Sequence, residues 1–127
     1  MLAVRVATKP LGYEFDVNDD WALSGIYRDV TIFSVPATHF TDLATRTTLA
    51  ADGSADFSVA VSISQPEGEV MAKLIAPDGK VVMEFPVAHE TRIKVEKPQL
   101  WTAETPALYQ LQLTLSDKGK PLQTFTE

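Results

Sequence analysis

The chain contains no cysteine, no cluster of basic residues and no long apolar run, and each absence excludes a class of function. Without cysteine there is no disulfide framework, no thiol catalysis and no zinc site with thiolate ligands. The absence of cysteine does not determine the cellular compartment. No apolar run approaches the roughly 20 residues that span a bilayer. The chain has 17 acidic against 11 basic residues and a formal charge of -6. Nucleic acid is therefore not an expected partner, because phosphate neutralisation supplies most of that affinity.

The composition that remains is that of one globular domain. Hydrophobic residues make up 45% of the 127 residues and charged residues 22%, which is ordinary for a folded domain. Residues 1–6 lack the basic leader and sustained apolar segment of a signal peptide. They have the alternation of a strand, and so do residues 124–127 at the other end. We therefore expect a piece of a longer protein.

Alternation of apolar and polar residues predicts a series of short β-strands. The clearest case is residues 57–63, where Phe57, Val59 and Val61 alternate with the small residues serine and alanine. Asp-Gly pairs at residues 52–53 and 78–79 supply the turn chemistry of hairpins. We expect strands at residues 2–7, 30–35, 39–49, 57–63, 70–74, 81–87, 92–96, 109–115 and after residue 120.

The strand pattern predicts an all-β fold. Seven or so short strands in the main body, with turn signals about every 8 to 12 residues and no helical period, fit an antiparallel two-sheet sandwich. A small barrel is the competing architecture. The alternation does not determine the strand order.

Residues 19–30 depart from plain alternation and predict an anchored corner. Trp21 and Tyr27 combine a large apolar area with a polar tip that needs a partner when buried. Gly25 can adopt the positive φ of a tight reversal. Arg28 suits a fixed, bidentate grip on a carboxylate.

Two segments, WALSGIYRDV at residues 21–30 and PQLWTAETPALY at residues 98–109, resemble glycoside hydrolase family 2, with the β-galactosidases closest. The resemblance implies that residues 1–35 are the end of a jelly-roll, sugar-binding-like domain with a linker. It implies that residues 36–127 are an immunoglobulin-like β-sandwich of about seven strands, preceded by the extra N-terminal strand. The (β/α)₈ barrel of the family would follow Glu127.

The same resemblance implies that the chemistry of the parent enzyme lies outside this chain. Family members hydrolyse β-linked sugars with retention, using two glutamates about 5–5.5 Å apart, and both belong to the barrel. No catalytic residue, cofactor or metal site is therefore expected here. Asp19, or its neighbour Asp20, matches an acidic residue that reaches the sugar pocket in the intact family enzymes. The implied partners are the adjacent jelly-roll and barrel domains and the β-linked saccharide, with a periplasmic or secreted location slightly favoured over the cytoplasm.

Other candidate sites in the sequence are weaker. Asp16, Asn18 and Asp20 have the spacing of a calcium loop, but the required glycine and final glutamate are missing. Two histidines are too few for a metal site, and a serine at residue 24 lacks the frame of a nucleophile elbow. Nothing in the spacing brings Glu90 and Glu104 together as a catalytic pair. The residues set aside in this way are Asp16, Asn18, Asp20, Ser24, His39, His89, Glu90 and Glu104.

Trp101, Pro106 and Tyr109 lie in or beside a proline-bracketed loop. The aromatic residues could stack on sugar rings, but packing is the favoured interpretation, with Tyr109 as a tyrosine-corner hydrogen bond and Trp101 as a lid on the sandwich. Two functions result: a non-catalytic spacer domain, or a free-standing module that binds carbohydrate or protein. Residues 2–7, as a strand without its parent sheet, also predict self-association.

Overall fold

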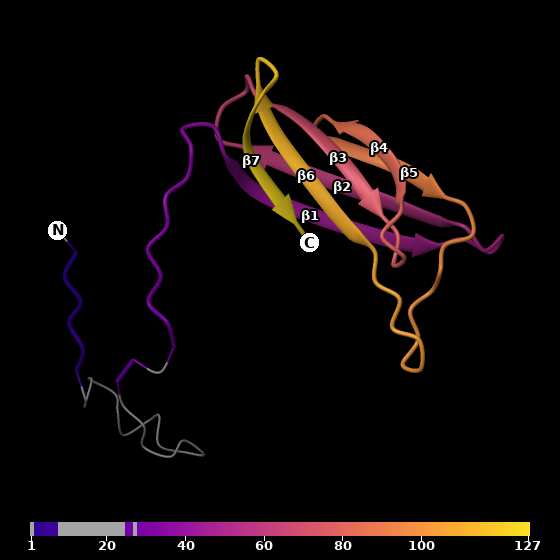
Figure 1. Ribbon diagram of the computed structural model, residues 1–127, viewed down its shortest axis with the longest axis horizontal. Coiled ribbons are helices and arrows are strands. Elements are labelled where there is room, and N and C mark those ends of the chain that lie inside the picture. The colour runs from indigo at the N-terminus through magenta and orange to yellow at the C-terminus, as the bar shows by residue number, and fades with distance from the viewer. Residues whose placement is uncertain (1, 8–24, 27) are drawn as a thin grey trace. The chain divides into compact units, whose positions relative to one another are not determined.

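The computed structural model describes residues 2–7, 25–26 and 28–127. The chain divides into two units, residues 1–34 and residues 35–127, and all strands of the described residues belong to the second (Figure 1). They are β1 (Phe40–Leu49), β2 (Ala55–Ile63), β3 (Glu69–Ile75), β4 (Val81–Val87), β5 (Glu90–Val95), β6 (Gln110–Asp117) and β7 (Lys120–Thr126).

The seven strands form two antiparallel sheets. One sheet has the order β1-β2-β5 and the other β4-β3-β6-β7, and every paired register is antiparallel. The predicted all-β sandwich is confirmed, and the chain crosses between the sheets at the β2–β3, β4–β5 and β5–β6 connections. No helix occurs in the described residues, so none there could cross a membrane.

The inner faces of the two sheets share one core. Val59 of β2 and Leu113 and Leu115 of β6 are 0% exposed, and the partly buried Phe57 packs against the same cluster. Burial in β2 follows the period of two that the sequence shows: Val59 and Val61 are buried, whereas Ser58, Ala60 and Ser62 are only partly buried. The buried cluster is Val59, Val61, Val70, Ala72, Leu74, Phe85, Val87, Val95, Leu111, Leu113 and Leu115.

Both Asp-Gly turns occur where the sequence predicts them. Gly53 and Gly79 each have φ +83°, the left-handed region that glycine enters without steric cost. In the second turn, the backbone N–H of Lys80 donates to Asp78 Oδ1 at 3.0 Å, which is the local hydrogen bond that favours aspartate in turns.

Two predicted strands are absent, which is a correction to the sequence-based expectation. Residues 2–7 and 30–35 carry no strand, although Leu2, Val4 and Val6 alternate as a strand would. A strand needs a ladder of hydrogen bonds to a neighbour, and neither segment has one in the described part of the chain. Their apolar side chains are exposed. The residue pattern of these two segments is therefore typical of strands, but it does not show whether a neighbouring strand is there to pair with them.

Candidate functional site

The β5–β6 connection, residues 96–109, is the most distinctive loop of the sandwich. It projects beyond the ends of the strands (orange in Figure 1). Thr102 and Thr105 exchange backbone hydrogen bonds at 3.0 and 3.2 Å, and Thr105 N also donates to Thr102 Oγ1 at 3.0 Å. Ala107 N donates to Thr105 O at 2.8 Å, and Ala107 is buried. The tip is therefore a hydrogen-bonded turn with a buried anchor behind it.

Tyr109 fixes the first part of this connection. Its hydroxyl accepts a hydrogen bond from the backbone N–H of Gln99 at 3.0 Å, and its ring packs against the core. This is the hydrogen bond that a tyrosine corner predicts. The two ends of the loop are thereby held together at the place where β6 begins.

The fixed loop presents apolar side chains to solvent. Leu100 is 51% exposed, Trp101 59% and Leu108 68%, and Pro106 is also exposed. The packing expected of Trp101 as a lid is therefore not formed in the described part of the chain. The exposure of Leu100 and Leu108 was not predicted from the sequence, although both are apolar residues in the proline-bracketed loop.

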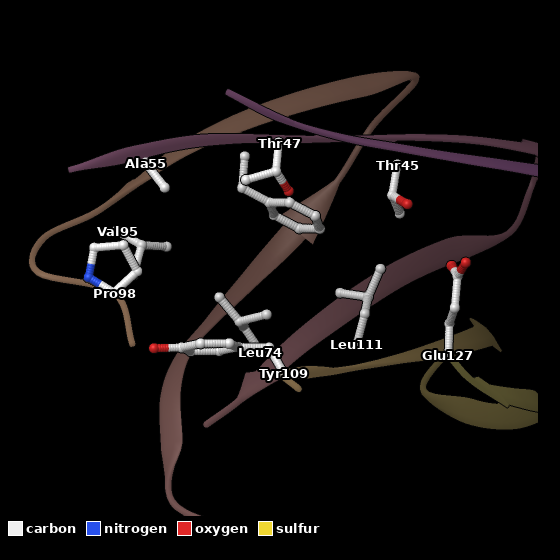
Figure 2. A pocket seen from close by; sticks show the side chains of 10 residues that line it. Thr45, Thr47, Ala55, Leu74, Val95, Pro98, Tyr109, Leu111 and Glu127 are labelled. Carbon is white, nitrogen blue, oxygen red and sulfur yellow. The ribbon is translucent and has the colours of Figure 1, made fainter. Parts of the chain in front are cut away.

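A cleft of about 270 Å³ opens between the sheets beside this loop (Figure 2). Thr45 and Thr47 of β1 lie on one wall, and Tyr109, directly before β6, and Leu111 of β6 lie on the opposite wall. The volume is slightly below the range of about 300–1,000 Å³ that is usual for small-molecule sites. The remaining lining residues are Ala55, Phe57, Leu74, Val95, Pro98 and Glu127.

Among the described residues, the carboxyl group with the largest pKa shift lies in the β1–β2 hairpin. Hydrogen bonds from the side chain and backbone of Ser54, and then one from Lys94, hold the pKa of Asp52 well below its usual value. Ser54 N lies 3.0 Å from Asp52 Oδ1 and Lys94 Nζ lies 3.0 Å from Oδ2. Ser54 is buried, so this arrangement stabilises the turn and leaves Asp52 little capacity to act as a base.

Neither Glu90 nor Glu104 belongs to a paired-carboxylate site. Glu90 lies on β5, where Arg92 Nη2 approaches its Oε1 at 3.0 Å, and Glu104 lies in the exposed loop.

The two histidines also lie apart from any metal-binding group. His39 Nδ1 is 3.0 Å from Pro36 O, and His89 is exposed between β4 and β5. Among residues 2–7, 25–26 and 28–127, no group of three His, Asp or Glu side chains could hold a metal ion.

Most of the predicted corner lies outside the described residues. This applies to Asp19, Trp21 and Tyr27, and also to Ser24 and the calcium-like pattern at residues 16–20. Gly25 is described and has φ +114°, the positive value that the sequence predicts. Arg28 is exposed.

Comparison with known proteins identifies the family. Residues 38–127 match the glycosyl hydrolases family 2. The chain belongs to this family. It is 32% identical over 141 residues to a β-galactosidase of Aeromonas hydrophila, and 35% identical over 143 residues to one of Photobacterium profundum; each alignment covers 97% of the chain. The chain spans 14% of the length of each of these relatives.

Solved structures of other family 2 enzymes share the fold. A β-glucuronidase of Ruminococcus gnavus matches with a TM-score of 0.63 and 22% identity over 72% of the chain and 15% of its own. An FMN-binding β-glucuronidase from Facaelibacterium prausnitzii L2-6 matches with a TM-score of 0.66 and 21% identity, over 72% of the chain and 16% of its own. At this identity the likeness shows the fold alone. The relatives are multidomain enzymes, so neighbouring domains are implied for this chain.

Proposed function

We propose that the chain is a non-catalytic spacer of a larger family 2 glycosidase. Residues 36–127 are its immunoglobulin-like domain, and residues 1–35 are the end of a preceding jelly-roll domain with a linker. The observation that carries this proposal is the fixed β5–β6 connection, which holds Leu100, Trp101 and Leu108 in solvent. Exposed apolar patches of this kind are typical of surfaces that contact another protein part.

The spacer holds the preceding domain and the barrel in a fixed relation, so that loops from outside the barrel reach the sugar pocket. The proposed joints with these neighbours are Trp21, Gly25, Tyr27 and Arg28 at one end and Trp101, Pro106 and Tyr109 at the other. The similarity to β-galactosidases supports a parent enzyme that hydrolyses terminal β-linked galactose with retention. Its two glutamates come from the barrel, and Asp19 accepts hydrogen bonds from sugar hydroxyls in the intact enzyme, a positioning role.

A substitution at Trp101 tests the joint directly. Because a joint residue makes its contacts with another domain, Trp101→Ser should change the free energy of unfolding of this chain by less than about 0.5 kcal/mol. Leu74→Ala, in the buried core, is the matched control and should cost about 2–5 kcal/mol. A loss above about 1.5 kcal/mol for Trp101→Ser would identify it as a packing residue of the sandwich itself.

An activity assay tests the non-catalytic role. The purified chain, incubated with a chromogenic β-galactoside, should show no turnover above the buffer background. Turnover that persists through repurification and scales with the amount of chain would overturn the proposal.

The exposure of Trp101 also supports a second function, a free-standing module that binds carbohydrate or protein. Aromatic rings can serve as binding platforms when they are exposed on a rigid loop. Titration of Trp21→Phe with galactose-containing oligosaccharides isolates the fluorescence of Trp101. The spacer predicts no saturable change, whereas a saturable change that is lost in a Trp21→Phe/Trp101→Phe double variant would support the binding module.

A further inference from the structure

Strand β1 is an open edge of the three-stranded sheet. It pairs with β2 from Phe40 to Leu49, and no strand of the described residues pairs with its other side. An edge of this length presents a row of backbone N–H and C=O groups that can pair with another strand. The register of β1 is irregular between Phe40 and Asp42 and regular from Asp42 to Leu49. These ten residues contain no proline and no glycine, so a ladder can continue along the regular part.

The edges of the four-stranded sheet are blocked by proline. Strand β4 contains Pro86 and strand β7 contains Pro121, and both strands lie at the outside of their sheet. Proline has no backbone N–H, so it interrupts any ladder that would form there.

The other edge of the three-stranded sheet, β5, is blocked by charge. Its outward side chains are Glu90, Arg92 and Lys94, and they are already held in ion pairs, Arg92 with Glu90 and Lys94 with Asp52, both at 3.0 Å. A second copy paired antiparallel about the middle of β5 would place Arg92 directly against Arg92, and like charges in that position are destabilising.

Strand β1 differs from β5, because the two charged side chains on its outer face are opposite in sign and are not already paired within the described residues. Asp42 and Arg46 stand on the outer face, opposite Ser62 and Ser58 of β2, and lie symmetrically on either side of Ala44. Neither side chain takes part in a hydrogen bond or ion pair in the part of the chain that the structure describes. Two opposite charges are thus exposed and four residues apart on an open edge.

We propose that β1 is a self-association edge, at which a second copy of this chain adds antiparallel about a two-fold axis at Ala44. In this register each Asp42 lies directly opposite Arg46 of the other copy, so that one pairing forms two cross-strand ion pairs. The small Ala44 meets Ala44 on the axis, and Leu43 meets Thr45 on the inner face. The result is one six-stranded sheet with the order β5-β2-β1-β1-β2-β5.

A single strand-to-strand contact buries less area than the 1,200–2,000 Å² or so of a stable interface. We therefore expect a weak monomer–dimer equilibrium that weakens further as salt screens the two ion pairs. Sedimentation equilibrium of the full 127-residue chain, at concentrations up to about 1 mM, measures its dissociation constant.

Charge reversal and charge exchange test the register. Arg46→Asp and Asp42→Arg each turn both cross-strand pairs into like-charge pairs and should weaken association about tenfold or more. The double variant Asp42→Arg/Arg46→Asp exchanges the charges and should restore the dissociation constant to within about threefold of the original. Arg92→Asp makes the same charge change on β5 and is the matched control that leaves association unchanged.

Sedimentation equilibrium of the chain and its variants can also overturn the proposal. A chain that stays monomeric over the whole range, or a dimer that is insensitive to Arg46→Asp, removes β1 as the contact. Val4→Asp tests the predicted self-association through residues 2–7, and it should leave the β1 dimer unchanged. Loss of association in Val4→Asp but not in Arg46→Asp would assign the contact to residues 2–7 instead. Hydrogen exchange that slows with concentration at residues 42–46 gives independent support, and unchanged exchange there in a dimer contradicts it.

Discussion

The hydroxyl of Tyr109 accepts a hydrogen bond from the backbone N–H of Gln99 at 3.0 Å, and the two residues are ten positions apart in the sequence. This contact joins the exit from β5 to the start of β6, and the tip between them is closed by its own hydrogen bonds. Leu100, Trp101 and Leu108 are therefore held in place rather than left on a free loop. A surface that is already ordered loses less conformational entropy when a neighbouring domain covers it.

Tyr109→Phe should lower the free energy of unfolding by about 0.5–1.5 kcal/mol, because it removes one hydrogen bond while keeping the packing of the ring. Urea denaturation measures the change. Gln99→Ala is the matched control, since it keeps the backbone N–H that makes the bond and should be nearly neutral. Equal losses in both variants would mean that the side chain of Gln99, and not this hydrogen bond, is responsible.

Gly68→Ala should destabilise the sandwich by about 1–3 kcal/mol through overpacking. A Cβ at this position would lie 2.6 Å from Leu115 Cδ1 and 2.8 Å from Ile63 Cδ1, and Leu115 is fully buried. The loss should shrink when Gly68→Ala is introduced into a Leu115→Val background, where that methyl group is gone. A cost that is the same in both backgrounds would contradict the steric cause.

Leu113→Ala should cost about 2–5 kcal/mol, because it removes buried methyl groups and leaves a cavity between the two sheets. Leu108→Ala is the matched control: Leu108 is exposed, so its loss should stay within about 0.5 kcal/mol. Thermal and urea unfolding of the two variants measure the contrast. Similar costs for the two leucines would place the core elsewhere.

Asp52→Asn should reduce stability at neutral pH and have less effect in acid. Because the hydrogen bonds from Ser54 lower the pKa of folded Asp52, the carboxylate stabilises the fold above its ordinary pKa of 3.8. That contribution is lost as pH falls below this value toward the lower pKa of the folded state. The difference between wild type and Asp52→Asn, measured by urea unfolding, should therefore shrink below about pH 4.

The cause of the Asp52 shift can be checked separately by NMR titration. Ser54→Ala removes the hydrogen bond that contributes most to the shift, so the pKa of Asp52 should return toward its usual value. A titration curve that is unchanged in Ser54→Ala would assign the shift to the hydrogen bonds that remain, from the backbone N–H of residue 54 and from Lys94.

The sequence predicts strands such as β2, β3 and β6 well because each of them buries one face. Alternation at residues 57–63 predicts β2, which the structure extends to Ala55, and the Asp-Gly turns set the hairpin positions. The strand order was not predictable, because alternation says which face is buried and not which strand lies alongside. The hairpin turn places β1 beside β2, but the position of β5 on the other side of β2 depends on pairings between distant residues.

The candidate site was predicted only in part, for a related reason. The hydroxyl of Tyr109 needs a partner when the ring is buried, and Gln99 supplies it. The size of Trp101 predicts burial, but no surface of the described residues covers it, and the side chain is 59% exposed. In the same way, Val4 and Val6 lie in an alternating segment that has no ladder. Local sequence patterns indicate that a side chain tends to be buried, but they do not indicate which other segment buries it.

Proline at β4 and β7 and the paired charges of β5 limit how far this fold can assemble. Amyloid-like growth needs two open ends, so that each added molecule offers a new place for the next. Among the strands of the described residues, a second copy at β1 occupies the one edge that is open, so assembly through these strands stops at two. Concentrated solutions of the chain should therefore stay clear and free of filaments.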